Sequence, residues 1–231
     1  MRGDLKLKKR LGCLHVHYSN IEYIENAFAP YNIELIHFVD PGLMNQVTKN
    51  KNFRESVAQR KVKEQIEWIA QCQVDAILIT CTNYIALLQE DQLSTSVPII
   101  KIDEPFFDYL CNIGIRQPQT ILFSNPATVE GTMERLKHHA SQQQKTLDLE
   151  AIVINNTFDL FMRGLEEEYN QGISTFLNQI INEKKVISVA QLSMVDAARQ
   201  VENQSFKTII NPLNTLVSFI VNQLELEEKN K

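Results

Sequence analysis

A single cysteine stands where a parallel sheet would place a reactive group. Cys81 is the last residue but one of the apolar run DAILITCT at 75–82. Thr82 ends this run and Asn83 follows it, and both are residue types that favour the N-cap position of a helix. α/β proteins bind ligands at the carboxyl ends of their parallel strands, where helix N-termini carry partial positive charge. Such surroundings lower a thiol pKa from about 8.5 towards about 7 or below. The position therefore predicts that Cys81 acts as a thiolate nucleophile or proton acceptor.

The other cysteines give no comparable signal. Cys13 lies inside an expected strand, and Cys72 and Cys111 lie inside expected helices, where free thiols are usually buried and inert. The four cysteines form no C-x-x-C pair, so the spacing suggests neither a disulfide framework nor a zinc site. Reduced thiols in a cytoplasmic protein are expected.

Two histidines could bind a metal from one strand. His15 and His17 stand two residues apart, so their side chains share a face of the strand. The first strand of amidohydrolase barrels carries such a pair, but that site needs further histidines on strands 5 and 6 and an aspartate on strand 8. The corresponding runs, TILFSN, LEAIVIN and KTIINP, lack these residues. We therefore predict no metal and keep His15 as a residue that lines a cleft.

A polar turn offers an anion site in the second part of the chain. Ser124, Asn125 and Thr128 follow the apolar run that begins at Thr120. A strand-to-helix turn of this kind presents N–H groups and hydroxyls to an anion, and the same groups cap the next helix. Both roles stay open at this stage.

Two adjacent carboxylates invite an acid/base role. Asp103 and Glu104 stand directly before Pro105, at the end of the run VPIIKID. Proline is favoured in the first turn of a helix, and acidic residues are favoured at its start. We therefore interpret the pair as the cap of a helix.

The elements that hold these residues are short apolar runs that alternate with amphipathic helical segments. Runs that are apolar almost throughout are typical of strands buried on both faces of a parallel sheet. We expect strands at 11–18, 33–40, 75–82, 97–103, 120–125, 149–155, 185–191 and 207–212.

Eight strand–helix units fit either a closed barrel or two open sheets. A short internal repeat favours two open sheets: the pair Ser19-Asn20 follows the first strand, and the same pair, Ser124-Asn125, ends the fifth. The predicted fold is therefore α/β, with two pseudo-symmetric halves, each a four-stranded parallel sheet flanked by helices. The first half spans 1–104 plus 207–231, and the second spans 105–206. The ends of strands 1, 3, 5 and 7 would then surround one cleft.

Composition narrows the classes of partner. The net charge of −5 over 231 residues argues against a nucleic-acid footprint. No run of eighteen apolar residues occurs, so no membrane partner is expected. The sequence has only seven glycines, and they form no glycine-rich motif, so a loop that binds nucleotide phosphates is not expected. The oligomeric state, including a homo-oligomer, is left open.

Several motifs resemble the aspartate/glutamate racemase superfamily. DAILITCTNY looks like its first cysteine motif, and VPIIKIDEP is similar to the strand that follows there. TILFSNPATVEGT resembles the opening of the family's second half, and VISVAQLSM resembles a variant of its second cysteine motif. LHVHYSN and IINPL also fit, so the resemblance covers essentially the whole chain.

The resemblance implies cofactor-independent chemistry between two α/β halves. In the racemases of the family, two cysteines face each other across the substrate's α-carbon, one removing the proton and the other returning it. Small polar residues at strand ends hold the substrate carboxylate. By motif match these would be Ser19 or Asn20, Thr82, Asn83, Ser124 and Thr128.

The sequence departs from the family at the second cysteine. Gln191 stands there, with Ser193 nearby, and a primary amide neither gives nor takes a proton at neutral pH. One hypothesis is an isomerase or racemase-like enzyme that uses the Cys81 thiolate on a small amino-acid or dicarboxylic-acid substrate, with Gln191 binding the substrate. The alternatives are a one-thiol lyase or decarboxylase, a small-acid binding protein and a purely structural role.

Overall fold

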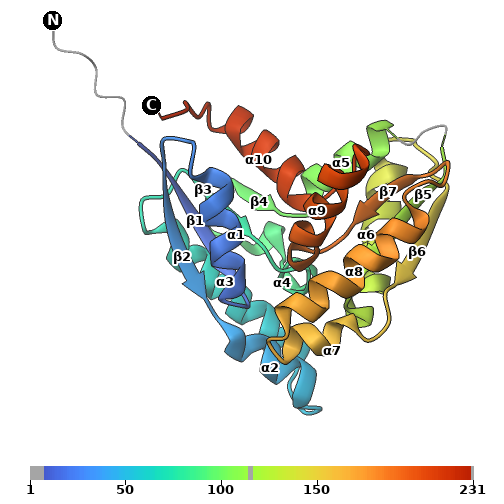
Figure 1. Cartoon of the computed structure of the whole chain (residues 1–231). Helices are drawn as coiled ribbons and strands as arrows, with labels where there is room; N and C mark the ends of the chain where they lie inside the picture. The colour runs from blue at the N-terminus through green and yellow to red at the C-terminus, as the bar shows by residue number, and fades with distance from the viewer. Residues whose placement is uncertain (1–7, 114–116, 230–231) are drawn as a thin grey trace, which may run out of the picture. The chain divides into compact units, whose positions relative to one another are not determined.

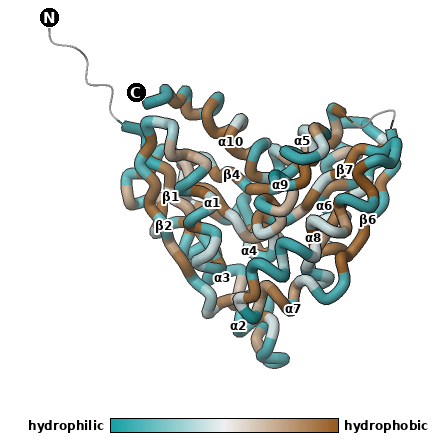
Figure 2. Tube along the Cα trace, viewed as in Figure 1, coloured by the Kyte–Doolittle hydropathy of each residue, from teal (hydrophilic) through white to brown (hydrophobic). Residues whose placement is uncertain are grey.

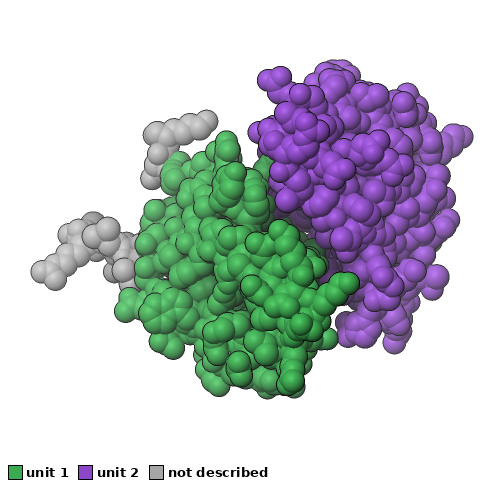
Figure 3. All heavy atoms as spheres, turned by 90° about the horizontal axis from the view of Figure 1, so that it is seen from below, with its two compact units in different colours: residues 1–102, 217–231 green, residues 103–216 purple. Residues whose placement is uncertain are grey.

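The apolar runs of the sequence form parallel strands gathered in two sheets (Figure 1). The structure, a computed structural model, describes residues 8–113 and 117–229. The chain divides into unit 1, residues 1–102 and 217–231, and unit 2, residues 103–216 (Figure 3). The predicted α/β class, with two parallel sheets flanked by helices, is confirmed. The domain boundaries drawn from the sequence, at 104 and 207, stay a prediction.

Unit 1 is built on a four-stranded parallel sheet. Its strands are β1 (Lys9–His15), β2 (Ile33–Val39), β3 (Ala76–Ile79) and β4 (Ile99–Lys101). Its helical elements are α1 (Ser19–Phe28), α2 (Pro41–Lys49), α3 (Glu55–Ala70), α4 (Thr82–Leu87) and η1 (Glu90–Gln92). The strands run in the order β2-β1-β3-β4, so the two central strands are β1 and β3. This places the ends of β1 and β3 next to each other.

Helices cover both faces of this sheet. Side chains alternate between the faces of a strand, so Gly12 and Cys13 point in opposite directions. A Cβ on Gly12 would lie 2.6 Å from Ile69 Cγ2 of α3, so glycine allows α3 to pack closely on that face. Cys13 pairs in register with His37, which contacts Glu25 of α1. The face that carries Cys13 therefore lies under α1.

Unit 2 repeats this plan with one strand reduced. It contains β5 (Gln119–Phe123), β6 (Leu149–Val153) and β7 (Val186–Val189) in the order β6-β5-β7. Its helices are α5 (Glu104–Ile113), α6 (Val129–Gln142), α7 (Thr157–Met162), α8 (Glu166–Ile180) and α9 (Val195–Ser205), with 3₁₀ turns η2 (Pro126–Thr128) and η3 (Leu192–Met194). α10 (Pro212–Gln223) begins in unit 2 and ends in unit 1.

The eighth predicted strand, 207–212, is reduced to one parallel bridge between Ile210 and Ser188 of β7. The segment is short for a physical reason. Phe206 adopts a left-handed backbone conformation just before it, and Pro212 starts α10 just after it. The predicted four strands of the second half are thus corrected to three strands and a bridge. The order of the strands still matches unit 1, with Ile210 beside β7 as β4 is beside β3.

Apolar residues line the strands of both sheets, and the helices mix apolar and polar residues (Figure 2). In unit 2 one core cluster gathers Leu122, Val189 and residues of α8 and α9. A second cluster packs α5 and α6 around Ile121 and Phe123. The sheet is therefore buried on both faces, as the uninterrupted apolar runs predicted. Within residues 8–113 and 117–229, no helix combines the length and hydropathy needed to cross a bilayer.

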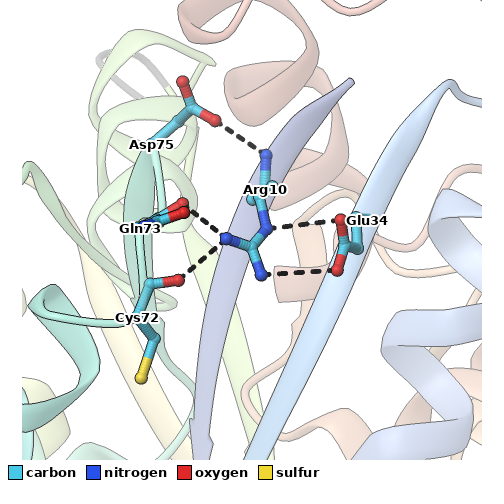
Figure 4. Close-up of polar contacts among 5 residues, drawn as sticks. All are labelled: Arg10, Glu34, Cys72, Gln73 and Asp75. Atoms are coloured by element: carbon cyan, nitrogen blue, oxygen red, sulfur yellow. Dashed lines mark hydrogen bonds and ion pairs between the residues drawn. The ribbon is translucent and has the colours of Figure 1, made fainter. Parts of the chain in front are cut away.

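The amino-terminal edge of the unit 1 sheet is fixed by Arg10 (Figure 4). Its guanidinium donates to the carbonyl oxygens of Cys72 at 2.9 Å and Gln73 at 3.1 Å, and its Nε lies 3.3 Å from Glu34 Oε2. Its backbone N–H donates to Asp75 Oδ2 at 2.8 Å. These contacts join the start of β1 to β2 and to the turn before β3. The amino-terminal ends of these strands are therefore held by structural contacts. The candidate site residues lie at the opposite, carboxyl ends of the strands.

Candidate functional site

Cys81 lies at the junction of β3 and α4 and is half-buried. It occupies the N-cap position of α4 itself, with extended backbone angles, and its carbonyl accepts from Ile85 N at 3.1 Å. The helix therefore starts one residue earlier than the sequence suggested, because Thr82 and Asn83 are its first residues rather than its cap. The sulfur is attached directly beside the helix N-terminus.

A tyrosine of the same helix faces the site. Tyr84, fully buried, places its hydroxyl 3.3 Å from Asp40 Oδ2, which also caps α2 through Gly42 N at 2.8 Å. Burial raises the pKa of Tyr84 above its ordinary value, and the charges of Asp40 and then Cys81 add to the effect. Sequence reasoning missed Tyr84 and Asp40, because their contact depends on packing between the ends of β2 and β3.

A chain of hydrogen bonds links the ends of β1, β2 and β3. We call it the unit 1 network: Asn20 Nδ2 donates to Thr80 Oγ1 at 3.3 Å, and that hydroxyl lies 2.9 Å from His15 Nδ1. His15 Nε2 lies 2.8 Å from His37 Nδ1, and His37 Nε2 lies 3.1 Å from Glu25 Oε1. Burial, and then the nearby charge of His37, lowers the pKa of His15 to about 4. His15 is therefore neutral at pH 7.

The two histidines considered as a metal pair separate. His15 is fully buried in the unit 1 network, whereas His17 Nδ1 contacts Ser19 Oγ at 2.7 Å in the turn before α1. Two of the predicted substrate-binding residues, Ser19 and Asn20, are the first two residues of α1. Asn20 reaches Thr80, directly before Cys81 in the sequence.

In unit 2, Gln191 ties the ends of β5 and β7 together. Its Oε1 accepts from Ser124 N at 2.7 Å, Ser124 Oγ at 2.9 Å and Asn125 N at 3.0 Å. Two of these donors are backbone N–H groups, so the oxygen, and not the amide nitrogen, must face them. The turn that could bind an anion thus receives the oxygen of Gln191.

Tyr169 of α8 completes this arrangement. Its hydroxyl lies 3.0 Å from Ser124 Oγ and 2.7 Å from Ser193 Oγ. We call Gln191, Ser124, Asn125, Tyr169 and Ser193 the unit 2 network. Burial raises the pKa of Tyr169, so its hydroxyl stays protonated at neutral pH. No sequence pattern marked Tyr169, which is brought to the strand ends by the packing of α8.

The remaining candidates of this turn act in capping. Asn125 Oδ1 accepts from Ala127 N at 3.0 Å, and Thr128 Oγ1 donates to the carbonyl oxygen of Asn125 at 2.9 Å. Both residues are half-buried. Of the two roles left open by the sequence, capping is therefore the one these side chains perform within the described contacts.

Asp103, which follows β4, forms an ion pair with Arg135 of α6. Asp103, with 7% of its side chain exposed, accepts from Arg135 Nε at 3.0 Å and from Arg135 Nη2 at 2.6 Å. Its carbonyl oxygen accepts from Phe107 N at 2.8 Å, so it holds the N-cap position of α5 through its backbone. The side chain was expected to cap α5 and instead pairs with α6.

Comparison with solved structures finds the same fold in several racemases. Picrophilus torridus aspartate racemase matches with a TM-score of 0.70 and 11% identity over 96% of each chain. A glutamate racemase from Campylobacter jejuni subsp. jejuni matches with 0.69 and 12%, covering 96% of this chain and 88% of its own. Allantoin racemase from Klebsiella pneumoniae gives 0.64 and 18%, over 96% and 90%.

These matches define the class of the fold. The chain has the fold of these aspartate, glutamate and allantoin racemases, which agrees with the fold that its motifs predicted. Comparison with protein-family models and with curated proteins gave no match. The reaction of this chain is therefore argued from its own residues.

Proposed function

We propose that the protein is a cofactor-independent, racemase-like isomerase that acts on a small carboxylate-bearing substrate through the Cys81 thiolate. The substrate is of the amino-acid or dicarboxylic-acid type. The observation that carries the proposal is the place of Cys81, half-buried at the end of a central strand and at the N-cap of α4. The fold shared with aspartate and glutamate racemases supports the reaction class.

The proposed reaction begins with proton transfer at the α-carbon. The thiolate takes the α-proton, and the electron pair left on carbon delocalises into the substrate carboxylate, giving an enolate-like intermediate. N–H groups of the first turn of α4, with the side chains of Asn20, Thr82 and Asn83, bind the carboxylate as its charge grows. Return of the proton from the Cys81 thiol to the same face of the carbon regenerates the substrate. The isomer forms when a water molecule protonates the opposite face and the resulting hydroxide takes the thiol proton, which restores the thiolate. His15 is fully buried, so we propose that it does not touch the substrate. It would instead hold the Thr80 hydroxyl, which accepts a hydrogen bond from Asn20 and so positions that side chain.

Gln191 determines how this reaction differs from two-base racemisation. Its side chain has no group that titrates near neutral pH, and its Oε1 is engaged by Ser124 and Asn125. Within the described contacts Oε1 holds the turn, and we propose that Nε2 donates to the anionic intermediate. With one proton carrier, exchange of the α-proton should exceed inversion of configuration.

The test is α-proton exchange in D₂O, followed by NMR over a panel of amino acids and dicarboxylic acids. We expect exchange with at least one substrate, and a loss of about 10²–10⁴-fold in Cys81→Ser, the range for removing a general acid/base group. Cys111→Ser is the matched control, because Cys111 is a free thiol buried in unit 2. Absence of Cys81-dependent exchange across the panel would contradict the proposal.

A small-acid binding protein is the second candidate, and the unit 2 network favours it. The donors on Ser124, which the motif match assigned to the substrate carboxylate, and on the adjacent Asn125 already bind Gln191 Oε1. A binding protein predicts that a small acid raises the melting temperature equally in the wild type and in Cys81→Ala, without turnover. An enzyme predicts exchange that Cys81→Ala removes.

A further inference from the structure

A thiol and two imidazoles converge under α1 in unit 1. Cys13 and His15 stand two residues apart on β1, so they share a face, and His37 is the register partner of Cys13 on β2. One ligand atom from each residue lies within 4.8 Å of the other two. Cys13 and His15 are fully buried, and 13% of the His37 side chain is exposed. His17, the other histidine of the sequence pair, does not belong to this group.

Both imidazoles have acceptors on their outer nitrogens. His37 Nε2 faces the Glu25 carboxylate at 3.1 Å, and a carboxylate only accepts, so this nitrogen carries a hydrogen. His15 Nδ1 faces Thr80 Oγ1 at 2.9 Å, and that hydroxyl can in turn donate to the carbonyl oxygen of Leu14 at 3.2 Å. Metal-binding histidines are held in this way, with the outer N–H donated to a carboxylate or another oxygen.

The inner nitrogens then meet inside the group. His15 Nε2 lies 2.8 Å from His37 Nδ1, so without a metal one of the two nitrogens donates a hydrogen to the other. When the hydrogen of His15 stands on Nδ1, where Thr80 Oγ1 can accept it, both inner nitrogens present lone pairs that a metal ion can bind. The sulfur of Cys13 at the same place favours a metal, because thiolate and imidazole are the ligands that zinc-like ions prefer.

We propose that Cys13, His15 and His37 form a site for one divalent transition-metal ion of the zinc type. The site is separate from the proposed chemistry of Cys81 and does not depend on it. Binding releases the thiol proton and any proton shared by the imidazoles, and forms one metal–sulfur and two metal–nitrogen bonds. A water molecule would take the fourth position.

The geometry needs only small side-chain movements. Zn–N bonds of about 2.0–2.1 Å and a Zn–S bond of about 2.3 Å, at tetrahedral angles, separate the ligand atoms by about 3.3–3.6 Å. The contact of 2.8 Å between the two histidines must therefore widen, and the Cys13 sulfur, within 4.8 Å, must move inward. Each change is about 1 Å or less, which side-chain rotation can supply.

Charge and access are also compatible with a bound ion. A divalent ion with one thiolate carries a net charge of about +1, and Glu25 on the outer nitrogen of His37 supplies the opposite charge. β2 is an edge strand, and 55% of the Glu25 side chain is exposed. An ion can therefore enter from the side of His37 without opening the core around Cys13.

The experiment measures binding rather than activity. The full chain is stripped with a chelator, dialysed against Zn²⁺ and analysed for metal content. We expect one ion per chain, and a melting temperature that rises with Zn²⁺ but not with Mg²⁺, a hard ion that prefers oxygen ligands. With Co²⁺ as the probe, we expect a sulfur-to-metal charge-transfer absorption.

Variants distinguish this site from other thiols. Cys13→Ser and His37→Gln should each lose the stoichiometric ion, whereas Cys111→Ser, buried in unit 2, and Cys81→Ser should retain it. His37→Gln is the safer variant for folding, because His37 is partly exposed on an edge strand. Retention of metal in Cys81→Ser also keeps this test independent of the proposed function.

Two results would overturn the proposal. The first is stripped wild-type protein that takes up no stoichiometric Zn²⁺, which would leave an ordinary hydrogen bond between His15 and His37. The second is metal that remains in a folded His37→Gln variant or is lost in Cys81→Ser, which would place the ion elsewhere.

Discussion

The unit 1 network and the unit 2 network occupy equivalent positions in two repeats of one topology, yet their chemistry differs. The unit 1 network contains two imidazoles and a carboxylate, from His15, His37 and Glu25. Unit 2 carries an amide, two serine hydroxyls and a buried tyrosine, Tyr169. Unit 1 therefore contains acid/base side-chain types that the unit 2 network lacks.

This difference shows that equivalent strand ends of a repeated topology can carry different polar groups. Where the resemblance implies a thiol, Gln191 supplies an amide, which carries no proton that titrates near neutral pH and adds an acceptor. That acceptor takes up the donors of Ser124 and Asn125, which would otherwise bind an anion. Under the proposed function, this one side chain would change both the reaction and the ligand that unit 2 can bind.

The largest effect is expected in the alkylation rates of the four cysteine thiols. In native protein alkylated at pH 7 and mapped by mass spectrometry, we expect Cys81 to react at least about tenfold faster than half-buried Cys72. Cys13 and Cys111 are fully buried and should react more than about 10³-fold slower, since they need the core to open. Equal rates for Cys81 and Cys72 would contradict an activated thiol at the N-cap of α4.

Removing a hydroxyl from each sheet compares the two cores. Thr80→Val leaves the buried Nδ1 of His15 without its partner and should cost about 2–3 kcal/mol in the free energy of unfolding. Thr120→Val is the matched control, because Thr120 is buried but bonds the exposed Glu150, and it should cost about 1 kcal/mol or less. Urea unfolding measures both, and equal losses would count against a buried unit 1 network.

Two variants of Gln191 test its role as an acceptor. Gln191→Glu keeps an oxygen for the three donors of Ser124 and Asn125, so its stability should stay within about 0.5 kcal/mol of the wild type. Gln191→Met removes the acceptor and should cost about 1–2 kcal/mol. Thermal and urea unfolding provide the comparison, and identical behaviour of the two variants would show that Oε1 does not hold the turn.

A modest effect is expected at Tyr169. Tyr169→Phe deletes the hydroxyl between Ser124 and Ser193 while keeping the ring in the core, so we expect a loss of about 1 kcal/mol. A loss several times larger, measured by urea unfolding, would mean that unit 2 depends on its polar network as strongly as unit 1.

Much of the fold could be predicted from the sequence, because buried parallel strands are apolar without alternation. The run ending at Cys81 was placed correctly at the end of a strand for this reason. The strand around Ile210 was over-predicted, because the apolar run did not reveal that Phe206 and Pro212 would confine pairing to one residue.

The polar networks could be predicted only in part. Asn20, Ser124 and Gln191 stand in recognisable motifs, but His37, Thr80 and Tyr169 join them through strand register and helix packing. Thr80 and His15 are 65 positions apart, and Tyr169 and Ser124 are 45 apart. No local pattern encodes such contacts, and for that reason the group of Cys13, His15 and His37 was not predicted either.

The central claim is that Cys81 is the only proton carrier acting on the substrate, and the ratio of exchange to inversion tests it. For one enantiomer of an accepted substrate in D₂O, α-deuteration is measured by NMR and inversion by chiral chromatography. We predict that the wild type deuterates much faster than it inverts, and that Gln191→Cys raises inversion relative to exchange. Inversion that keeps pace with exchange in the wild type would contradict the account.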